Sequence, residues 1–313
     1  PAANQLLVRV ARSQVSAGSE MNFLRHGAAG YGLPPGSPSR MAIGYMTVGR
    51  IAAIGDGVTG YTVGERVVTG GTHASHHLVD LSNPNAPIER VPDNVSDDVA
   101  GFAALGDVAL HGVRRASLQI DESVAVFGMG IVGQLTLQLA RLSGAHPLIA
   151  VDLFDSRLDK AKQSGATHIV NASRDDPVQA IRAITHGVGA ETVFHCTQVA
   201  NILQSLLESA AERATIVLTG SPPGTATIGL QAELLRRELT IVGNYEVGLT
   251  QPHGYWPWTR GRNRRACLRL MSEGRLQLDH LITHVVPHTD AQEIFEMMLR
   301  GGEDWLGVVF KWD

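Results

Sequence analysis

The stretch VAVFGMGIVGQLTLQLARLSG, residues Val124–Gly144, decides the fold of this chain. It begins with a short apolar run typical of a buried strand and ends in a pattern typical of a helix. Between them lies a G-x-G-x-x-G, which predicts a dinucleotide site when it follows a strand and opens a helix. Gly128 would allow a tight turn and Gly130 the close approach of a pyrophosphate. Gly133 would let the helix pack on the strand, with its N-terminus facing the phosphates.

Outward from this stretch, strand and helix patterns alternate with short joints. Strands are predicted near 123–128, 147–152, 167–170, 191–196, 214–220 and 239–244. Helices are predicted near 131–144, 156–165, 176–187 and 201–212. This alternation is typical of βαβ units around a parallel sheet, so the fold class is α/β with a Rossmann sheet.

The first part of the chain has a different texture. From Gln5 to about Pro92, short β-branched runs such as LLVRV and TVGRIAAIG are broken by glycine and proline, which predicts a small β-rich unit. After about residue 245 the patterns predict a helix near 265–274, a strand near 281–286, a helix near 290–301 and a last strand near 307–312.

Composition excludes several classes of protein. The chain has 313 residues and a net charge of −4, so no global field favours nucleic acid or an anionic membrane. No apolar run reaches the roughly 20 residues of a spanning helix, and no signal peptide is visible. The two cysteines, Cys196 and Cys267, form no spaced cluster, which argues against a disulfide scaffold and a four-cysteine zinc lobe. We expect a reducing cytoplasm. The strand-like run close behind Pro1 leaves open whether the natural N-terminus is present.

The second predicted strand of the α/β block indicates which dinucleotide binds. It ends at Asp152, 19 residues after Gly133. A carboxylate there accepts hydrogen bonds from ribose hydroxyls and repels a 2′-phosphate, which favours NAD over NADP. Arg157 argues the other way, since an arginine can contact that phosphate. Two later strand ends border the cofactor crevice and should touch nicotinamide or its ribose. The predicted cofactor contacts are Gly128, Met129, Gly130, Ile131, Val132, Gly133, Asp152, Leu153, Arg157, Cys196, Thr197, Thr219 and Gly220.

Several further motifs have a family likeness. SAGSE, GYMTVGRIAAIGDGV, GERVV and ALHGVRRA, together with the dinucleotide segment, make the chain resemble the medium-chain dehydrogenase/reductase superfamily over essentially its whole length. The resemblance implies a GroES-like catalytic domain at 1–102 and 246–313, a Rossmann domain at 103–245, a substrate cleft between them and a homodimer. SAGSEMNFLRHG, GYMTVGR, LITH and FKWD are also similar to the 3-hydroxyethyl bacteriochlorophyllide dehydrogenase family, which lacks zinc.

The resemblance locates the positions of the catalytic zinc ligands. Ala17 stands where zinc-dependent members have a cysteine, and Tyr45-Met46 where they have His-Glu. Zinc prefers thiolate, imidazole or carboxylate, so we expect no metal site. Zinc held by other ligands stays an alternative. Near THASHHLVD, His76 and His77 would point to opposite faces of a strand, so we expect exposed or packed histidines there.

Without zinc, the substrate oxygen needs hydrogen-bond donors and a group that exchanges its proton. The candidate catalytic residues are Tyr45, Ser19, Glu20, Asp107 and His111. Each could instead be a packed or structural residue. Tyr255, Trp256 and Trp258 could line a substrate pocket or pack a domain interface.

The sequence therefore predicts a zinc-independent, NAD-preferring oxidoreductase that interconverts an alcohol and a ketone or aldehyde. One alternative is a quinone or enoyl reductase that uses NADPH, against which Asp152 argues. Another is a redox sensor that binds NAD(H) without turnover.

Overall fold

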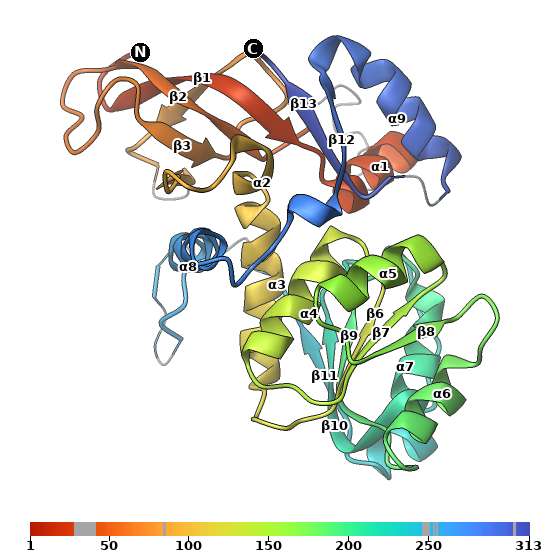
Figure 1. The fold of residues 1–313 in the computed structure, drawn as a ribbon. Helices are drawn as coiled ribbons and strands as arrows, with labels where there is room; N and C mark the ends of the chain where they lie inside the picture. Colours follow the sequence, from red (N-terminus) through yellow and green to blue (C-terminus); the bar gives the residue numbers. More distant parts are fainter. Residues whose placement is uncertain (28–41, 84–85, 246–250, 253, 255, 303–304) are drawn as a thin grey trace. The chain divides into compact units, whose positions relative to one another are not determined.

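The computed structural model describes residues 1–27, 42–83, 86–245, 251–252, 254, 256–302 and 305–313. Contacts divide the chain into two compact units. Unit 1 comprises Pro1–Ala104 and Val247–Asp313, and unit 2 comprises Leu105–Glu246. Unit 1 is rich in antiparallel strands, whereas unit 2 is a parallel sheet with helices (Figure 1). The predicted fold class is confirmed.

Unit 2 contains six parallel strands in the order β11-β10-β9-β6-β7-β8. The strands are β6 (Val124–Phe127), β7 (Leu148–Asp152), β8 (His168–Asn171), β9 (Ala190–His195), β10 (Ala210–Leu218) and β11 (Thr240–Gly243). The helices are α3 (Ala103–Ala116), α4 (Ile131–Leu142), α5 (Asp155–Gln163), α6 (Pro177–Ile184) and α7 (Leu203–Ser209), with short helical turns at Ala200–Ile202 and Leu230–Leu235. The winding direction reverses between β6 and β9. In such sheets, ligands bind at the carboxyl ends of the strands beside this reversal.

Unit 1 is built on a seven-stranded sheet in the order β12-β13-β1-β2-β3-β5, with β4 also paired to β1. Its strands are β1 (Gln5–Gln14), β2 (Thr47–Ile54), β3 (Arg66–Thr69), β4 (His76–Asp80), β5 (Ile88–Arg90), β12 (Ile282–Pro287) and β13 (Gly307–Lys311). Its helices are α1 (Ala17–His26), α2 (Asp97–Ala100), α8 (Arg260–Ser272) and α9 (Ala291–Arg300), with short turns at Asp279–Leu281 and His288–Asp290. β1 is central because it pairs with β2, β4 and β13.

Several helices differ from the sequence prediction. α8 begins at Arg260, five residues before its predicted start. α1 lies in a region whose texture predicted a β-rich unit. The helix predicted over 201–212 ends at Ser209, because Ala210 is already in β10 and pairs with Ala190 of β9. Within the described residues, no helix has both the length and the apolar character needed to cross a membrane.

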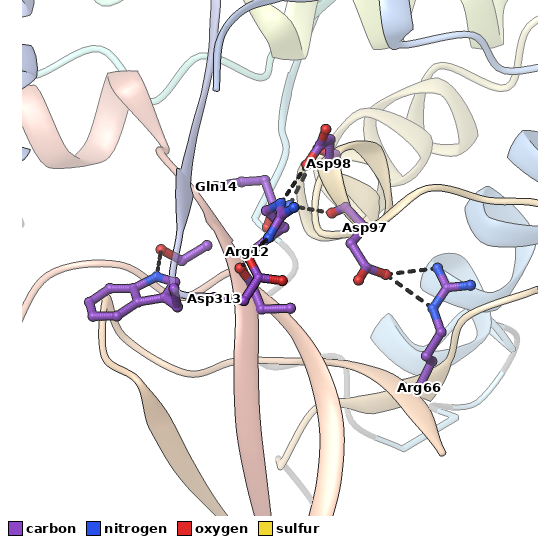
Figure 2. A network of polar contacts seen from close by, with 9 residues as sticks. Arg12, Gln14, Arg66, Asp97, Asp98 and Asp313 are labelled. Atoms are coloured by element: carbon purple, nitrogen blue, oxygen red, sulfur yellow. Dashed lines mark hydrogen bonds and ion pairs between the residues drawn. The ribbon is translucent and has the colours of Figure 1, made fainter. Parts of the chain in front are cut away.

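Ion pairs fix the C-terminal end of the chain to β1 and α2. The guanidinium of Arg12 contacts Asp98 at 2.7 Å and Asp313 at 2.5 Å. Arg66 on β3 donates from Nε and Nη2 to Asp97 at 3.0 and 2.8 Å (Figure 2). The two guanidinium groups are largely buried, with exposed fractions of 19% and 16%, so their pairs with Asp98 and Asp97 are less screened by water than surface pairs; Asp313 is 63% exposed.

Candidate active site

Each glycine of the loop between β6 and α4 meets a different steric requirement. Gly128 has φ +94°, and a Cβ there would lie 2.7 Å from Thr197 Cγ2 and 3.0 Å from the Cys196 carbonyl carbon. A Cβ on Gly133 would lie 1.7 Å from the carbonyl oxygen of Gly128, so only glycine lets α4 pack this closely. A Cβ on Gly130 would have no described atom within 4 Å. The first and last glycines serve the fold, and the middle one borders open space.

The open space beside Gly130 lies at the N-terminus of α4. Gly130 is the N-cap, and its carbonyl accepts the first intrahelical hydrogen bond, from Gln134. The N–H groups of the first helical residues, Ile131 to Gly133, have no intrahelical acceptor and carry the positive end of the helix dipole. An open approach with such donors fits the pyrophosphate of a dinucleotide.

The carboxylate of Asp152 ties this loop to the end of β7. Its Oδ2 accepts from Met129 N at 2.6 Å, and its Oδ1 accepts from Leu153 N at 2.8 Å and Phe154 N at 3.1 Å. A carboxylate offers about four acceptor positions, so one position on Oδ2 remains for a ribose hydroxyl. The guanidinium of Arg157 lies 5.0 Å from the centroid of the Phe154 ring.

The structure brings together the two predicted strand ends, Cys196-Thr197 and Thr219-Gly220. Thr219 N and Gly220 N both donate to the His195 carbonyl, at 2.9 and 2.7 Å. A Cβ on Gly220 would lie 2.2 Å from Thr197 O, so the two strand ends are in close contact. Burial raises the pKa of Cys196 to about 12. This side chain is therefore a thiol at neutral pH, which argues against a role as a nucleophile.

Asp107 and His111 lie on α3 and are buried, with exposed fractions of 0% and 4%. Burial, with smaller contributions from Arg115 and Arg114, lowers the pKa of His111 to about 4. The imidazole is therefore neutral at pH 7. The catalytic role of both residues remains a prediction.

A polar cluster of unit 1 contains two of the predicted catalytic residues. The Tyr45 hydroxyl lies 2.5 Å from Ser16 Oγ. Glu20 is fully buried on α1; its Oε1 accepts from Ser16 N at 2.8 Å, and its Oε2 lies 2.9 Å from His73 Nε2. His73 Nδ1 lies 2.7 Å from Ser13 Oγ. Sequence reasoning identified Tyr45 and Glu20 but missed the other three. Two of them stand in stretches that the sequence analysis singled out: Ser16 is the first residue of SAGSE, and His73 lies in THASHHLVD.

Ser19, the remaining candidate of this unit, is a partly buried residue of α1 next to Glu20. Its hydroxyl is not part of the Tyr45–Ser16 contact. Its catalytic role stays a prediction.

Comparisons with known proteins agree with this geometry. Residues 132–258 match the family model for zinc-binding dehydrogenases. D-guloside 3-dehydrogenase of Escherichia coli K12 is 29% identical over 258 residues, covering 82% of this chain and 73% of that protein. Sorbitol dehydrogenase 2 of Saccharomyces cerevisiae is 24% identical, covering 94% and 87%. A structure described as short chain alcohol dehydrogenase (rspB) from Escherichia coli CFT073, with NADH, has a TM-score of 0.80 at 20% identity, covering 99% and 93%. The chain is therefore similar to the zinc-binding dehydrogenases of the medium-chain dehydrogenase/reductase superfamily. It is an alcohol dehydrogenase-like oxidoreductase.

Ala17, Tyr45 and Met46 stand at the positions where the superfamily resemblance predicts zinc ligands. Ala17 begins α1, Tyr45 is half-buried just before β2, and Met46 is a core side chain with 1% exposure. A methyl group, a phenol and a buried thioether do not fit zinc, which takes thiolate, imidazole or carboxylate. Among the described residues, no three or more His, Cys, Asp or Glu side chains are grouped to hold a metal.

The sequence predicts that Tyr255, Trp256 and Trp258 line a substrate pocket or pack a domain interface. Tyr255 lies outside the described residues. Trp256 and Trp258 are partly buried, and the guanidinium of Arg262 lies 4.0 Å from the Trp258 ring centroid. The role of all three as pocket residues stays a prediction.

Proposed function

We propose that this protein is a zinc-independent, NAD-preferring oxidoreductase that interconverts a secondary alcohol and a ketone. The contact between Tyr45 and Ser16 supports the proposal, because it pairs two hydroxyl groups in the segments where the superfamily resemblance implies zinc ligands. A hydroxyl can both donate to a carbonyl oxygen and accept the proton of an alcohol, which are the tasks left once the metal is absent.

The proposed chemistry needs one proton transfer from the protein. A bound nicotinamide supplies or accepts the hydride. In the direction of reduction, the Tyr45 hydroxyl donates a hydrogen bond to the carbonyl oxygen and gives up its proton as negative charge develops there. Ser16 Oγ then donates its hydrogen to the phenolate oxygen and stabilises it. Tyr45 is only half-buried, so solvent can return the proton. Oxidation follows the same path in reverse.

The proposed preference for NAD rests on Asp152. Its carboxylate retains one acceptor position for a ribose hydroxyl, and its charge repels a 2′-phosphate. The NADH in the Escherichia coli neighbour supports the use of a nicotinamide cofactor.

The substrate, assembly and location are further parts of the proposal. Because the named relatives act on a guloside and on sorbitol, we expect a polyol or a sugar with a secondary hydroxyl. β11 is an edge strand of the parallel sheet, and a homodimer through this edge would cover its unpaired backbone groups. The two free cysteines, Cys196 and Cys267, suit a reducing cytoplasm.

The test combines isotope transfer with one substitution. Deuterated NADH is offered with a panel of ketoses and simple ketones, and deuterium in the product is measured by mass spectrometry. Tyr45→Phe should lower kcat by about 10²-fold or more, the usual contribution of a general acid, whereas NADH affinity should stay unchanged. Tyr61→Phe is the matched control, because this ring packs under Arg90, 4.9 Å from its guanidinium carbon.

Three outcomes would contradict the proposal. Full activity of Tyr45→Phe would remove Tyr45 from the chemistry. Stoichiometric zinc in active protein would mean that other ligands hold a metal. Tight NADH binding without deuterium transfer to any carbonyl would favour the redox sensor.

A further inference from the structure

We infer that Glu20 and His73 are positioning residues that hold the Tyr45–Ser16 hydroxyl pair, and that Trp312 fixes the orientation of His73. The inference rests on the proposed function, since it assigns the support for the proposed proton donor. All five residues belong to unit 1.

His73 contacts the segment that carries Tyr45. Its backbone N–H donates to Ile43 O at 3.0 Å. Its ring lies against Gly44, where a Cβ would be only 2.9 Å from His73 Cδ2. Gly44 also has φ +94°, so glycine is required there on both counts. The backbone next to Tyr45 is thereby held by one residue from a distant turn.

Glu20 extends this support to the second hydroxyl. One carboxylate oxygen contacts His73 and the other accepts the N–H of Ser16, so the carboxylate bridges the imidazole and the residue that carries the hydroxyl. Glu20 lies in the first turn of α1, where the helix dipole favours negative charge. Since it is fully buried and both oxygens are engaged, its contacts define its position.

The Glu20 carboxylate, which only accepts, selects the ring nitrogen of His73 that carries hydrogen, and Trp312 supports this choice through Ser13. Trp312 Nε1, which can only donate, lies 2.9 Å from Ser13 Oγ. The Ser13 hydroxyl hydrogen is then available for His73 Nδ1, at 2.7 Å. Nε2 keeps its hydrogen and donates it to Glu20. In this series of hydrogen bonds, each donor points away from Trp312 and toward the buried carboxylate of Glu20.

Aromatic packing leaves the imidazole little freedom to turn. Phe310 meets the His73 ring edge-on, with centroids 5.3 Å apart and planes at 85°. Phe295 lies 6.2 Å away at 60°. Trp312 is itself stacked on His288, with centroids 4.4 Å apart. Hydrogen bonds and packing therefore act on the same orientation of the ring.

The first experiment separates orientation from folding. Trp312→Phe removes one N–H and keeps an aromatic ring against His288. We expect kcat to fall by about tenfold, in the range known for loss of an outer hydrogen-bond partner, with KM and NADH affinity unchanged. Asp313→Asn is the matched control: it weakens the neighbouring contact with Arg12 and should leave kcat unchanged.

The second experiment reads the tautomer directly. In Glu20→Gln, the amide oxygen must face the Ser16 N–H, so the amide NH₂ faces His73 Nε2 and requires a lone pair there. We expect the ring to change from the Nε2–H to the Nδ1–H form, as seen by imidazole nitrogen NMR in histidine-labelled protein, and kcat to fall by about tenfold or more. An unchanged tautomer would overturn the inference.

Tyr45→Phe distinguishes a failure of the positioning inference from a failure of the proposed function. If it is inactive while Trp312→Phe and Glu20→Gln keep wild-type kcat, the positioning inference is wrong and the proposed function stands. If Tyr45→Phe is fully active, the proposed function itself fails. A fall in kcat for all three, with unchanged KM and NADH affinity, supports both.

Discussion

Substitution of single glycines should separate cofactor binding from stability in the loop between β6 and α4. Gly130→Ala is expected to fold normally and to bind NADH poorly, whereas Gly133→Ala is expected to lose stability. The contrast follows from the space around each Cα. A methyl group on Gly130 meets no described atom, and one on Gly133 would lie 1.7 Å from the Gly128 carbonyl oxygen.

The magnitudes follow from these distances. Gly130 has φ −66°, which alanine adopts without strain. Losing glycine as an N-cap costs a few tenths to about 1 kcal/mol, and the smaller entropy of the unfolded chain returns about 0.4–1 kcal/mol. The net change in the free energy of unfolding should be close to zero. In Gly133→Ala the contact must be relieved by moving α4 off β6, at a cost of about 3 kcal/mol or more.

The assay combines urea unfolding with NADH fluorescence titration on both variants. For Gly130→Ala we expect an unchanged unfolding midpoint and an NADH Kd raised at least tenfold, or about 1.4 kcal/mol. Wild-type NADH affinity in this variant would refute the assignment of the open space to the pyrophosphate. A stable Gly133→Ala would refute the steric argument for α4.

Three other substitutions have defined outcomes. In Asp152→Asn, the single amide oxygen can accept either from Met129 N or from Leu153 N, so one of these N–H groups loses its acceptor, at a cost of about 1–3 kcal/mol of stability. Because the negative charge is also lost, the ratio of NADP to NAD activity should rise about tenfold. His111→Gln should flatten the acid dependence of stability. The folded pKa of His111 is about 4, below its ordinary value of 6.5, so the unfolded chain binds more protons between these two pH values. Wild-type stability in urea unfolding should therefore fall as the pH drops from 6.5 to 4, by up to about 1.4 kcal/mol per pH unit, and less so in the variant. Arg66→Lys loses the paired donors to Asp97 and should lower the free energy of unfolding by about 1 kcal/mol, with no change in NADH affinity.

The dinucleotide unit could be predicted because its signals are local. The G-x-G-x-x-G specifies a turn, an open approach and a close helix–strand contact within six positions. The alternation of strands and helices then limits the topology to a parallel sheet. Even so, the end of α7 was predicted three residues too late, since AAE has helix propensity and only pairing with β9 makes Ala210 a strand residue.

The polar cluster of unit 1 could not be predicted because it depends on a break in strand alternation. Leu6, Val8 and Val10 are buried at even positions of β1. A register shift between Val10 and Arg12 reverses the alternation, so that Ser13 faces inward. A one-residue shift exchanges the two faces of a strand, and no residue type in ARSQ signals it.

The partners in this cluster are also far apart in sequence: His73 lies 53 residues from Glu20 and 60 from Ser13, and Trp312 lies 299 residues from Ser13. The proposed function gives a physical reason for such contacts. A metal ion fixes its ligands and the substrate oxygen by coordination, whereas a phenol has free rotation about its bonds and must be oriented by its surroundings. Tyr45 alone therefore could not replace zinc. The replacement requires a buried carboxylate, an imidazole in one tautomer and an indole N–H, drawn from both ends of unit 1.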